Sequence, residues 1–443
     1  MPRMNKAANQ AAADALASSA AAAATEARAV RLQSRGSSQG GLRQYNERVV
    51  LQVVRLQGPL PAADIARHCK LTAQTVSLIT KRLLDDGLLL KGEPQRGKVG
   101  QPSVPLRLNP DGAYAIGIKI GRRSMDVVLL DFTAQVRQRW QLDYTHADPD
   151  MLLPEIAARL KDIRKKLGPV QRDRLQGIGI AAPLSMGGWK QLLGLPDAVA
   201  RKWRAADANG RAGNLTGDLV RRVGRLTELP VTLIKDTAAA CVAELVAGRG
   251  RSVPSFLYVF VDTFIGGGLV LDSQLRTGNT GNAGAVGSLP LWTAPTAASL
   301  PSQGAPAQLL SVASLLTLER AYAAAGLDGS ALADTRALQA PWLPHTQAWL
   351  ATAAAAIAQA VQSAACLLDL EGAIVDGSFS RELLASLLEH TTLALQRYDW
   401  EGVAQPRLMA GTIGSDARAL GGALLPLYAN FAPDRELFLK VAG

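Results

Sequence analysis

The side chains between residues 72 and 82 have the types and the spacing of a surface that could read DNA. Val76, Ile79 and Leu83 recur at intervals of three and four residues, which predicts a helix with one buried face. The hydroxyl, amide and cationic groups that remain can hydrogen-bond to base edges and to phosphates. We expect this helix to contact DNA through Thr72, Gln74, Thr75, Ser77, Lys81 and Arg82, with Thr72 also capping it.

A helix that reads DNA needs neighbours that bury its apolar face, and residues 42–69 provide two. One helix is expected from residue 42 to Gly58, and a shorter one after Pro61 with Ile65 and Ala66 turned inward. Lys70 stands near the next turn, where left-handed glycine is common, and a lysine in that conformation would cost about 1 kcal/mol. The apolar stripe of the first helix consists of Tyr45, Val49, Val53 and Leu56.

A basic hairpin is expected after the third helix, which Gly87 should end. Two extended runs, residues 88–90 and 103–108, flank a polar turn with Arg96 and Lys98, which we expect to contact phosphates. Three helices and a basic hairpin predict a winged helix-turn-helix over residues 42–108, with double-stranded DNA as its partner. The alternative is an ordinary three-helix subdomain whose polar face is merely solvated.

The charge distribution agrees with a polyanionic partner at the N-terminal end. The 443 residues carry 48 Lys and Arg against 37 Asp and Glu. Residues 1–110 hold 16 of these cations and 7 of these anions, a balance of +9, which leaves +2 for the remainder. A basic face that only favours solubility is the alternative. Residues 1–41 are rich in alanine and end in a Ser- and Gly-rich stretch, so we predict a disordered tail.

The rest of the composition indicates a globular protein of a reducing compartment. Hydrophobic residues make up 48%, and Cys69, Cys241 and Cys366 are too few and too far apart for a disulfide framework or a metal knuckle. A cytoplasmic location is therefore expected. Residues 349–370 are apolar but interrupted by polar side chains and lack a basic flank, so a buried helix is expected rather than a membrane span.

The chain after residue 109 alternates strands and helices, which predicts an α/β fold. Its length suggests two lobes with a cleft between them. Strands are expected at residues 115–121, 125–131, 177–181, 231–234, 257–261, 267–271 and 373–375, and helices at 151–167, 214–226, 237–248, 310–325, 346–369 and 380–397.

The order of the motifs resembles the ROK family (repressors, open reading frames and kinases), and most of all its sugar-responsive repressors. The resemblance implies a two-lobed actin-like, RNase H-like ATPase fold that assembles as homodimers or homotetramers. It places lobe I at about 109–236 plus a C-terminal helix at about 418–443, and lobe II at about 237–417. The motifs are Ile116 to Gly121, Gly179 to Pro183, Lys235 to Glu244, Ile265 to Gly268 and Gly284 to Ser288.

Several departures from the family pattern argue against sugar kinase activity. Asp236 matches the family's catalytic base, but Ala238 replaces an asparagine that would hold sugar hydroxyls. Lys119 replaces the acid of the first phosphate loop, where the bulky Arg122 also replaces a glycine. In the second loop Asp262 and Phe264 stand where glycines are usual, and both disfavour a bound phosphate. The triglycine 266–268 is equally explained by close strand packing.

The sugar and zinc elements of the family are altered too. Ala285 to Ser288 replaces a Glu-x-Gly-His segment, and no cysteine occurs between Ser288 and Cys366, so we expect neither a metal nor a cofactor. An effector could still bind at Lys235, Asp236, Gly284 and Ser288. Trp189, Trp203 and Trp292 could stack on such a ligand, although core packing is the alternative for each.

Three hypotheses follow from the sequence. The first is a DNA-binding regulator, a repressor of carbohydrate-related genes, whose larger domain senses an effector and oligomerises without kinase activity. The second is a sugar kinase fused to a DNA-binding domain, which Asp236 alone supports. The third is a ligand-free scaffold for oligomerisation or docking on DNA, because the sugar pocket has lost several polar groups.

Overall fold

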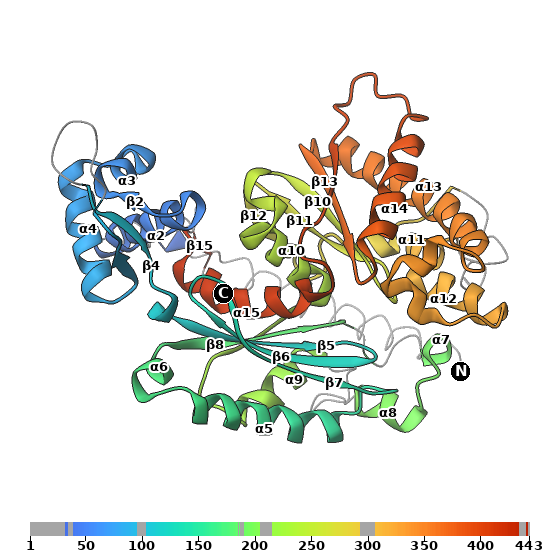
Figure 1. Cartoon of the computed structure of the whole chain (residues 1–443), viewed down its shortest axis with the longest axis horizontal. Helices are drawn as coiled ribbons and strands as arrows, with labels where there is room; N and C mark the ends of the chain where they lie inside the picture. Colours follow the sequence, from blue (N-terminus) through green and yellow to red (C-terminus); the bar gives the residue numbers. More distant parts are fainter. Residues whose placement is uncertain are drawn as a thin grey trace, which may run out of the picture. The chain divides into compact units, whose positions relative to one another are not determined.

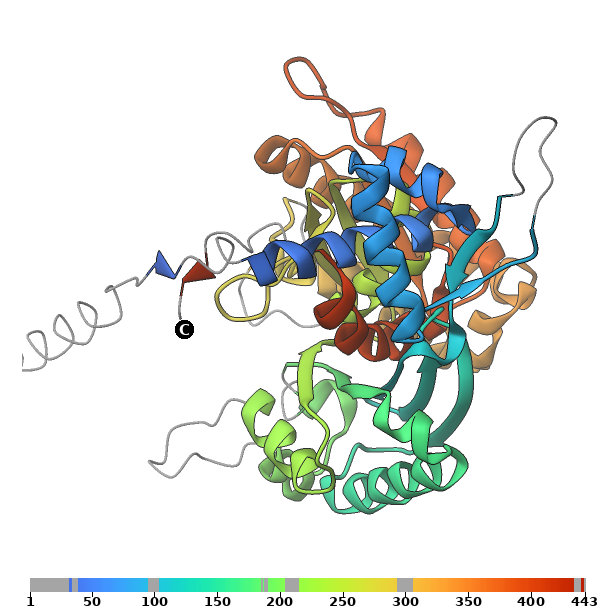
Figure 2. The same ribbon diagram turned by 90° about the vertical axis from the view of Figure 1, so that its left-hand side faces the viewer.

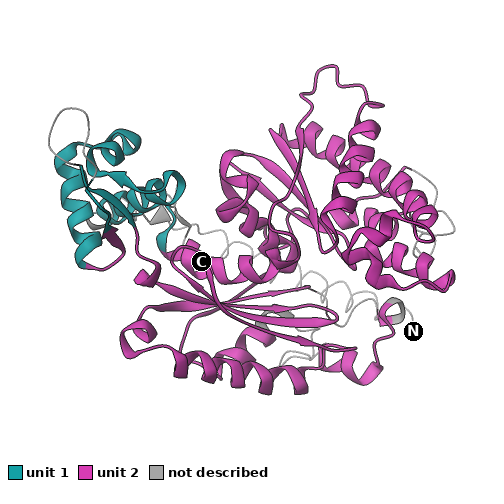
Figure 3. Cartoon of the chain, in the orientation of Figure 1, with its two compact units in different colours: residues 1–85, 91–107, 431–443 teal, residues 86–90, 108–430 magenta. Residues whose placement is uncertain are grey.

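The computed structural model describes residues 32–33, 39–94, 103–184, 186, 190–203, 215–292, 306–433 and 440–441. The chain divides into two compact units (Figure 3). The first comprises residues 1–85, 91–107 and 431–443, and the second comprises residues 86–90 and 108–430.

The first unit is built from three helices and a small sheet (Figure 2). The helices are α2 (Gln39–Gln57), α3 (Ala62–Cys69) and α4 (Ala73–Asp85). The sheet has the order β2-β4-β3, formed by Leu60–Pro61, Pro105–Leu108 and Leu89–Lys91. Two short strands, β1 (Leu32–Gln33) and β15 (Lys440–Val441), pair in antiparallel fashion. Within the described residues, three helices and the strands that follow them lie in the order predicted for residues 42–108.

The buried face of α2 differs from our prediction. Val50, Leu51 and Val54 are at most 3% exposed, whereas the predicted stripe of Tyr45, Val49, Val53 and Leu56 is only partly buried. Apolar residues occupy 49–51 and 53–54 with only Gln52 between them, so their periodicity fits two neighbouring faces of the helix equally well. Packing against α3 and α4 selects the face one residue further along the chain. The helix also begins at Gln39, three residues before the predicted start.

The turn between α3 and α4 keeps the left-handed geometry that glycine commonly adopts there, although the residue is a lysine. Lys70 has a φ of 55° and a ψ of 35°. The N–H of Leu71 donates to the carbonyl of Ala66 over 3.2 Å, which closes α3. Ile65 and Ala66 of α3 and Val76, Ile79 and Leu83 of α4 are buried, as predicted.

The first lobe of the second unit is a five-stranded sheet of order β7-β6-β5-β8-β9. Strands β5 (Tyr114–Ile120) and β6 (Ser124–Asp131) form the predicted hairpin, and β8 (Leu175–Ala182) and β9 (Val231–Lys235) continue the sheet in parallel. Strand β7 (Val136–Asp143) pairs with β6 and was not predicted, because five of its eight residues are polar. The helices are α5 (Pro149–Lys166), α6 (Pro169–Asp173), α7 (Lys190–Leu193), α8 (Asp197–Lys202) and α9 (Leu215–Gly224).

The second lobe has a five-stranded sheet of order β12-β11-β10-β13-β14. Its strands are Gln274–Arg276, Gly266–Leu271, Phe256–Val261, Gly372–Gly377 and Arg407–Ala410. The helices are α10 (Asp236–Ala247), α11 (Leu309–Ala313), α12 (Leu315–Ala324), α13 (Leu343–Leu368) and α14 (Arg381–Leu395). Short 3-10 turns occupy Pro110–Gly112, Arg249–Ser252, Val286–Ser288, Gly329–Ala333, Thr335–Leu338 and Gly414–Asp416.

The helix predicted at residues 310–325 is interrupted. Ser314 separates α11 from α12, and its hydroxyl donates to the carbonyl of Leu310 over 2.6 Å. The same oxygen accepts the N–H of Ile265 over 3.0 Å. A serine that binds backbone groups in this way competes with helix continuation.

Helix α13 is long and apolar enough to cross a membrane by length and composition. It lies in the core of the second lobe, where Trp349, Leu350, Ile357 and Val361 are at most 5% exposed. The prediction of a buried helix here is confirmed.

Two helices, α10 and α15 (Ala417–Phe431), lie between the two sheets (Figure 1). Small residues allow this close packing, because a Cβ on Gly421 would lie 1.7 Å from the carbonyl oxygen of Ala239. A Cβ on Gly179 of β8 would lie 1.9 Å from the carbonyl oxygen of Gly422. We expected lobe I to include a helix over residues 418–443, but α15 ends at Phe431 and the residues after it group with the first unit. There Arg48 Nη1 donates to the carbonyl of Ala432 over 3.4 Å.

Candidate functional sites

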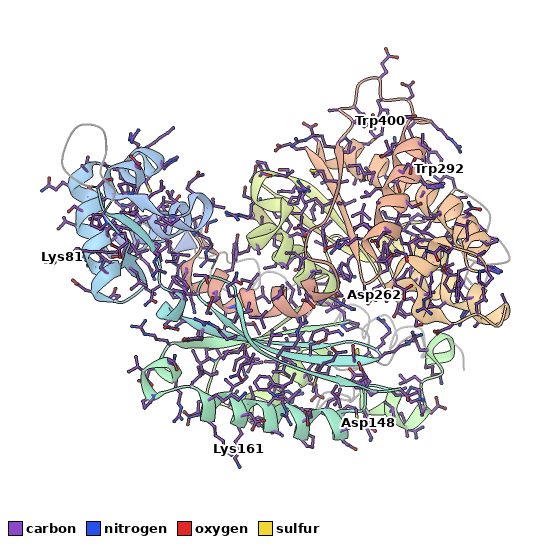
Figure 4. The ribbon with its side chains drawn as sticks, in the orientation of Figure 1. Lys81, Asp148, Lys161, Asp262, Trp292 and Trp400 are labelled. Atoms are coloured by element: carbon purple, nitrogen blue, oxygen red, sulfur yellow. The ribbon has the colours of Figure 1, made fainter. Side chains whose placement is uncertain are left out.

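The exposed face of α4 is the first candidate site. The N–H of Thr75 donates to Thr72 Oγ1 over 3.2 Å, which confirms the predicted cap. The two hydroxyl oxygens are 2.8 Å apart, so the two threonines share a hydrogen bond. This bond uses part of the hydrogen-bonding capacity of each side chain. Gln74, Ser77 and Lys81 are exposed, and within the described residues their side chains form no hydrogen bond or ion pair. Figure 4 places Lys81 on the outward side of α4.

Arg82 differs from the other cation of this face. Its Nη1 lies 3.2 Å from Oε1 of Glu47 on α2, and its side chain is 43% exposed. Part of its hydrogen-bonding capacity is therefore used inside the unit. Arg96 and Lys98 lie outside the described residues.

One residue of this face escaped the sequence analysis. Leu78 is 55% exposed, although leucine is usually buried. It lies between Ser77 and the buried Ile79, off the apolar stripe, which is the signal that could have identified it. An exposed apolar group on a DNA-reading helix can contact the methyl group of thymine.

The second candidate site is a cluster of charges where the two lobes meet, and we call it the junction cluster. Its cations are Lys119, Arg122 and Arg418, and its carboxylates are Asp126, Asp236 and Asp262. Asp262 follows β10 and lies between the lobes in Figure 4. The six formal charges cancel.

Arg418 of α15 and Asp262 form the central ion pair of the junction cluster. A second nitrogen, Nη2, donates to Ser378 Oγ over 3.2 Å, and the guanidinium carbon lies 5.3 Å from the ring centroid of Phe260. Burial alone would raise the pKa of Asp262, but the Arg418 guanidinium outweighs it and the pKa is lowered. Asp262 is therefore ionised and paired.

Buried carboxylates fix the segment that leads into Arg418. Glu244 of α10 accepts the N–H of Ile413 over 2.9 Å and that of Arg249 over 2.7 Å. Asp376 of β13 accepts the N–H of Gly414 over 2.7 Å. Both are fully buried, and their bonds hold the turn just before α15. Arg418 is thus positioned by two elements of the second lobe.

The remaining groups of the junction cluster also have partners. Lys119 Nζ lies 3.0 Å from Asp126 Oδ2 and 2.5 Å from Ser124 Oγ. Burial lowers the pKa of Lys119, and the nearby Arg418 charge lowers it further, against the opposing effect of Asp126. The guanidinium carbon of Arg122 lies 4.5 Å from the ring centroid of Phe264. Protein charges and a phenyl ring therefore occupy the two segments in which we expected altered phosphate loops.

The predicted effector residues are only partly brought together. Lys235 Nζ donates to Asn282 Oδ1 over 3.2 Å and to the carbonyl of Ala283 over 3.3 Å, next to Gly284. Asp236 begins α10, is 9% exposed, and accepts the N–H of Thr237 over 2.9 Å. Ser288 is exposed on a 3-10 turn. Asn282 was missed, because its role depends on a contact across 47 residues.

Burial lowers the pKa of Lys235 to about 8, although the Asp236 carboxylate opposes the shift. Lys235 therefore changes charge close to physiological pH. A ligand at this position would meet a mixture of ammonium and amine.

Close packing explains the glycines near this site. Gly284 has a φ of +67°, and a Cβ there would lie 2.7 Å from the backbone of Gly268. A Cβ on Gly267 would lie 2.2 Å from the carbonyl oxygen of Tyr258. The triglycine thus serves strand and loop packing, the alternative that the sequence analysis kept open.

Two of the candidate tryptophans have defined surroundings. Trp203 is 8% exposed in the core of the first lobe and donates its indole N–H to the carbonyl of Ala147 over 2.6 Å. Trp292 is 85% exposed. Trp189 lies outside the described residues. Trp203 therefore packs in the core, as the alternative interpretation held.

Neither candidate site resembles a metal centre. Among the described residues, no group of three or more His, Cys, Asp or Glu side chains could hold a metal ion. A small pocket of about 90 Å³ adjoins the junction cluster and is lined by Arg122, Arg123, His146 and Met186, among others.

Comparison with known proteins places this architecture among regulators and kinases of one fold. The ROK family profile matches residues 115–428. A putative xylose repressor of Caldicellulosiruptor sp. (strain Rt8B.4) is 26% identical over 251 residues, which cover 56% of this chain and 59% of that protein. The transcriptional dual regulator NagC of Escherichia coli K12 is 21% identical over 256 residues, 56% of this chain and 58% of that protein. The matched segment thus spans less than two thirds of these relatives.

Solved structures show the same fold. A ROK family transcriptional regulator, a homolog of the E. coli Mlc protein, superposes with a TM-score of 0.61 at 19% identity, covering 88% of this chain and 98% of that one. A ROK family glucokinase from Streptomyces griseus gives a TM-score of 0.52 at 19% identity, covering 71% and 99%. The fold is therefore shared by repressors and sugar kinases.

The Asp262–Arg418 pair should contribute strongly to the stability of the lobe junction. We expect Arg418→Met to lower the free energy of unfolding by up to about 3–5 kcal/mol, because it leaves the largely buried carboxylate of Asp262 without its partner. Combining it with Asp262→Asn should recover part of that loss, with a coupling energy above about 1 kcal/mol. Urea-induced unfolding of the two single variants and the double variant measures this coupling. Effects that add within about 0.5 kcal/mol would show that the two groups do not interact.

The lowered pKa of Lys235 predicts a stability that rises in mildly alkaline solution. Below about pH 8 both the folded and the unfolded chain carry the charge. Between this value and the ordinary value of 10.5, the folded protein has lost the proton that the unfolded chain retains, so the free energy of unfolding increases with pH.

Relative to Lys235→Met, the wild-type protein should gain about 1–2 kcal/mol between about pH 7.5 and about pH 9.5. Urea unfolding at the two pH values measures the difference. The exposed Lys81→Met is the control; it retains Lys235, so its stability should change with pH as that of the wild type does. An equal pH trend in Lys235→Met and wild type would contradict the assignment.

Proposed function

This chain belongs to the ROK family, and we propose that it is a DNA-binding transcriptional regulator, a repressor of carbohydrate-related genes. The exposed, unpartnered side chains of Gln74, Ser77 and Lys81 on α4 carry this proposal. The excess of cations in residues 1–110 supports it. Named repressors among the relatives support the link to carbohydrates.

We assign the DNA-binding domain to residues 42–108 and the ROK domain to residues 109–443. The recognition surface comprises Thr72, Gln74, Thr75, Ser77, Lys81 and Arg82 on the third helix, with Arg96 and Lys98 in the wing. Gln74 reads a base edge, while Lys81, Arg96 and Lys98 bind phosphates. Leu78 adds an apolar contact. The protein acts in the cytoplasm as a homodimer or homotetramer, so its operator has two half-sites.

The ROK domain senses a sugar-like effector and oligomerises, and it does not transfer phosphoryl groups. Asp236 supports the competing kinase hypothesis, but phosphoryl transfer also needs a metal-bound nucleotide beside it. The Asp262–Arg418 pair and the Arg122–Phe264 stack occupy the surroundings of that nucleotide. Asp236 is therefore a remnant of the kinase site that now, with Lys235, Gly284 and Ser288, surrounds an effector.

Effector binding changes the population of lobe arrangements rather than creating a new state. The two lobes are joined by Arg123 of the first and Glu319 of the second, with two N–O distances of 3.1 and 2.9 Å. An exposed pair of this kind contributes little to stability, so a ligand can bias it. The resulting arrangement sets the spacing of two recognition helices in the assembled oligomer.

Two substitutions test the DNA-binding surface, because one should change the base preference and the other the affinity for all sequences. Gln74→Ala should alter base preference, with a loss of about 1–3 kcal/mol at one operator position and little change on unrelated DNA. Lys98→Ala should weaken binding equally on all sequences and reduce the salt slope by about 1. Fluorescence anisotropy with fragments of the protein's own promoter region, measured from about 50 to about 200 mM salt, separates the two effects.

Arg201→Ala removes an exposed cation from α8 and serves as the matched control, with unchanged affinity expected. Absence of salt-sensitive binding to any fragment would overturn the proposed function. An equal effect of Gln74→Ala on all sequences would overturn only the role assigned to Gln74.

A further inference from the structure

A pocket of about 320 Å³ opens on the first lobe between α5, α6 and the sheet. Its lining shares no residue with the junction cluster or with the predicted effector site. Ile116 of β5 and Leu160 of α5 are buried at its base. Leu175, Leu226 and Leu229 extend this apolar surface toward the opening.

Four cations surround the apolar base. Lys161, Arg164 and Lys165 lie on consecutive turns of α5, and Arg172 lies on α6. All four are exposed, and none forms an ion pair within the part of the chain that the structure describes. Arg172 Nε donates to the carbonyl of Leu167 over 2.9 Å, which orients the guanidinium. Figure 4 shows Lys161 on the outer side of α5.

The other two cations of α5 are paired with carboxylates or stacked on a ring. Arg159 of α5 contacts Glu155 over 2.8 Å and Asp162 over 2.9 Å. Lys166 Nζ lies 5.5 Å from the ring centroid of Trp140. The cations of α5 outside the pocket thus have partners, whereas those around the pocket form no ion pair among the described residues.

We propose that this pocket binds an organic anion that has an apolar body and a carboxylate or phosphate group. The leucine and isoleucine surface removes the body from water, and the four cations hold the charged end. The volume is at the lower end of the range for ligand sites, so the ligand is small. A bare inorganic anion would leave the apolar base exposed to water.

Occupancy of the pocket is coupled to the DNA-binding helix through α6, a part of the inference that rests on the proposed function. Arg174 follows Arg172 by two residues and donates to the carbonyls of Gly87 over 3.2 Å and Asp111 over 2.8 Å. Gly87 comes two residues after Asp85, the last residue of α4. A ligand that draws Arg172 into the pocket therefore acts on the chain segment that ends α4.

Calorimetric titration of the full chain with two anionic probes tests the site. Octanoate presents a carboxylate and phenyl phosphate presents a phosphate, and benzyl alcohol is the neutral control. At least one anion should bind with a Kd below about 1 mM and at least about tenfold more tightly than benzyl alcohol. Failure of both anions to saturate below about 10 mM, or equal binding of the neutral probe, would overturn the proposal.

Two variants locate the binding in this pocket. Arg164→Gln removes one cation, and Leu226→Glu adds a repelling charge at the opening; each should weaken the bound anion about tenfold. Both residues are exposed, so neither change should unfold the protein. Arg201→Gln is the control and should bind as the wild type does. Unchanged binding in both pocket variants would place the anion elsewhere and contradict the assignment.

The same probe added to the DNA titration tests the coupling separately. A change in DNA affinity that Arg164→Gln removes would support transmission through α6. Intact probe binding with unchanged DNA affinity would overturn the coupling and leave the site. If the full chain does not bind DNA even when no probe is present, the result would instead count against the proposed function.

Discussion

The buried pair of Asp262 and Arg418 is the interaction on which the properties of the lobe junction depend. Asp262 follows a strand of the second lobe, and Arg418 lies near the start of α15, 156 residues later. Their charges, with those of Lys119 and Asp126, are balanced inside the protein. A nucleotide would bring several negative charges to the same place, and it would have to displace Asp262 from its partner. Leaving Asp262 without its partner would cost up to about 3–5 kcal/mol, the range for a buried ion pair, so under the proposed function it would oppose nucleotide binding.

The rest of the fold holds this pair in place. Gly421 and Gly422 let α15 approach α10 and the first sheet closely, so the helix that carries Arg418 has little freedom to move. Glu244 and Asp376 bind the backbone just before α15. The architecture of a two-lobed kinase is thus retained while its centre contains protein charges. The proposed function requires such a domain to bind a ligand and to change its lobe arrangement.

Most helices and strands could be predicted from local sequence patterns. Contacts between residues far apart in the sequence could not. The Thr72 cap and the buried stripe of α4 depend on neighbouring residues, so they could be inferred from spacing. The face of α2 could not, because consecutive apolar residues fit two orientations. The sequence indicated that Asp262 disfavours a bound phosphate. Its partner Arg418 could not be identified, because the two residues are 156 positions apart. The Arg82–Glu47 pair and the cations around the α5 pocket likewise depend on how separate helices pack.

The central claim is that the lobe junction is closed to nucleotides by its own charges, and calorimetric titration of the full chain with magnesium-ATP tests it most directly. We predict no saturable heat of binding up to about 1 mM nucleotide, since affinity of that order corresponds to only about 4 kcal/mol. Saturable binding below this concentration that disappears in Asp236→Asn would contradict the claim and restore the sugar kinase hypothesis.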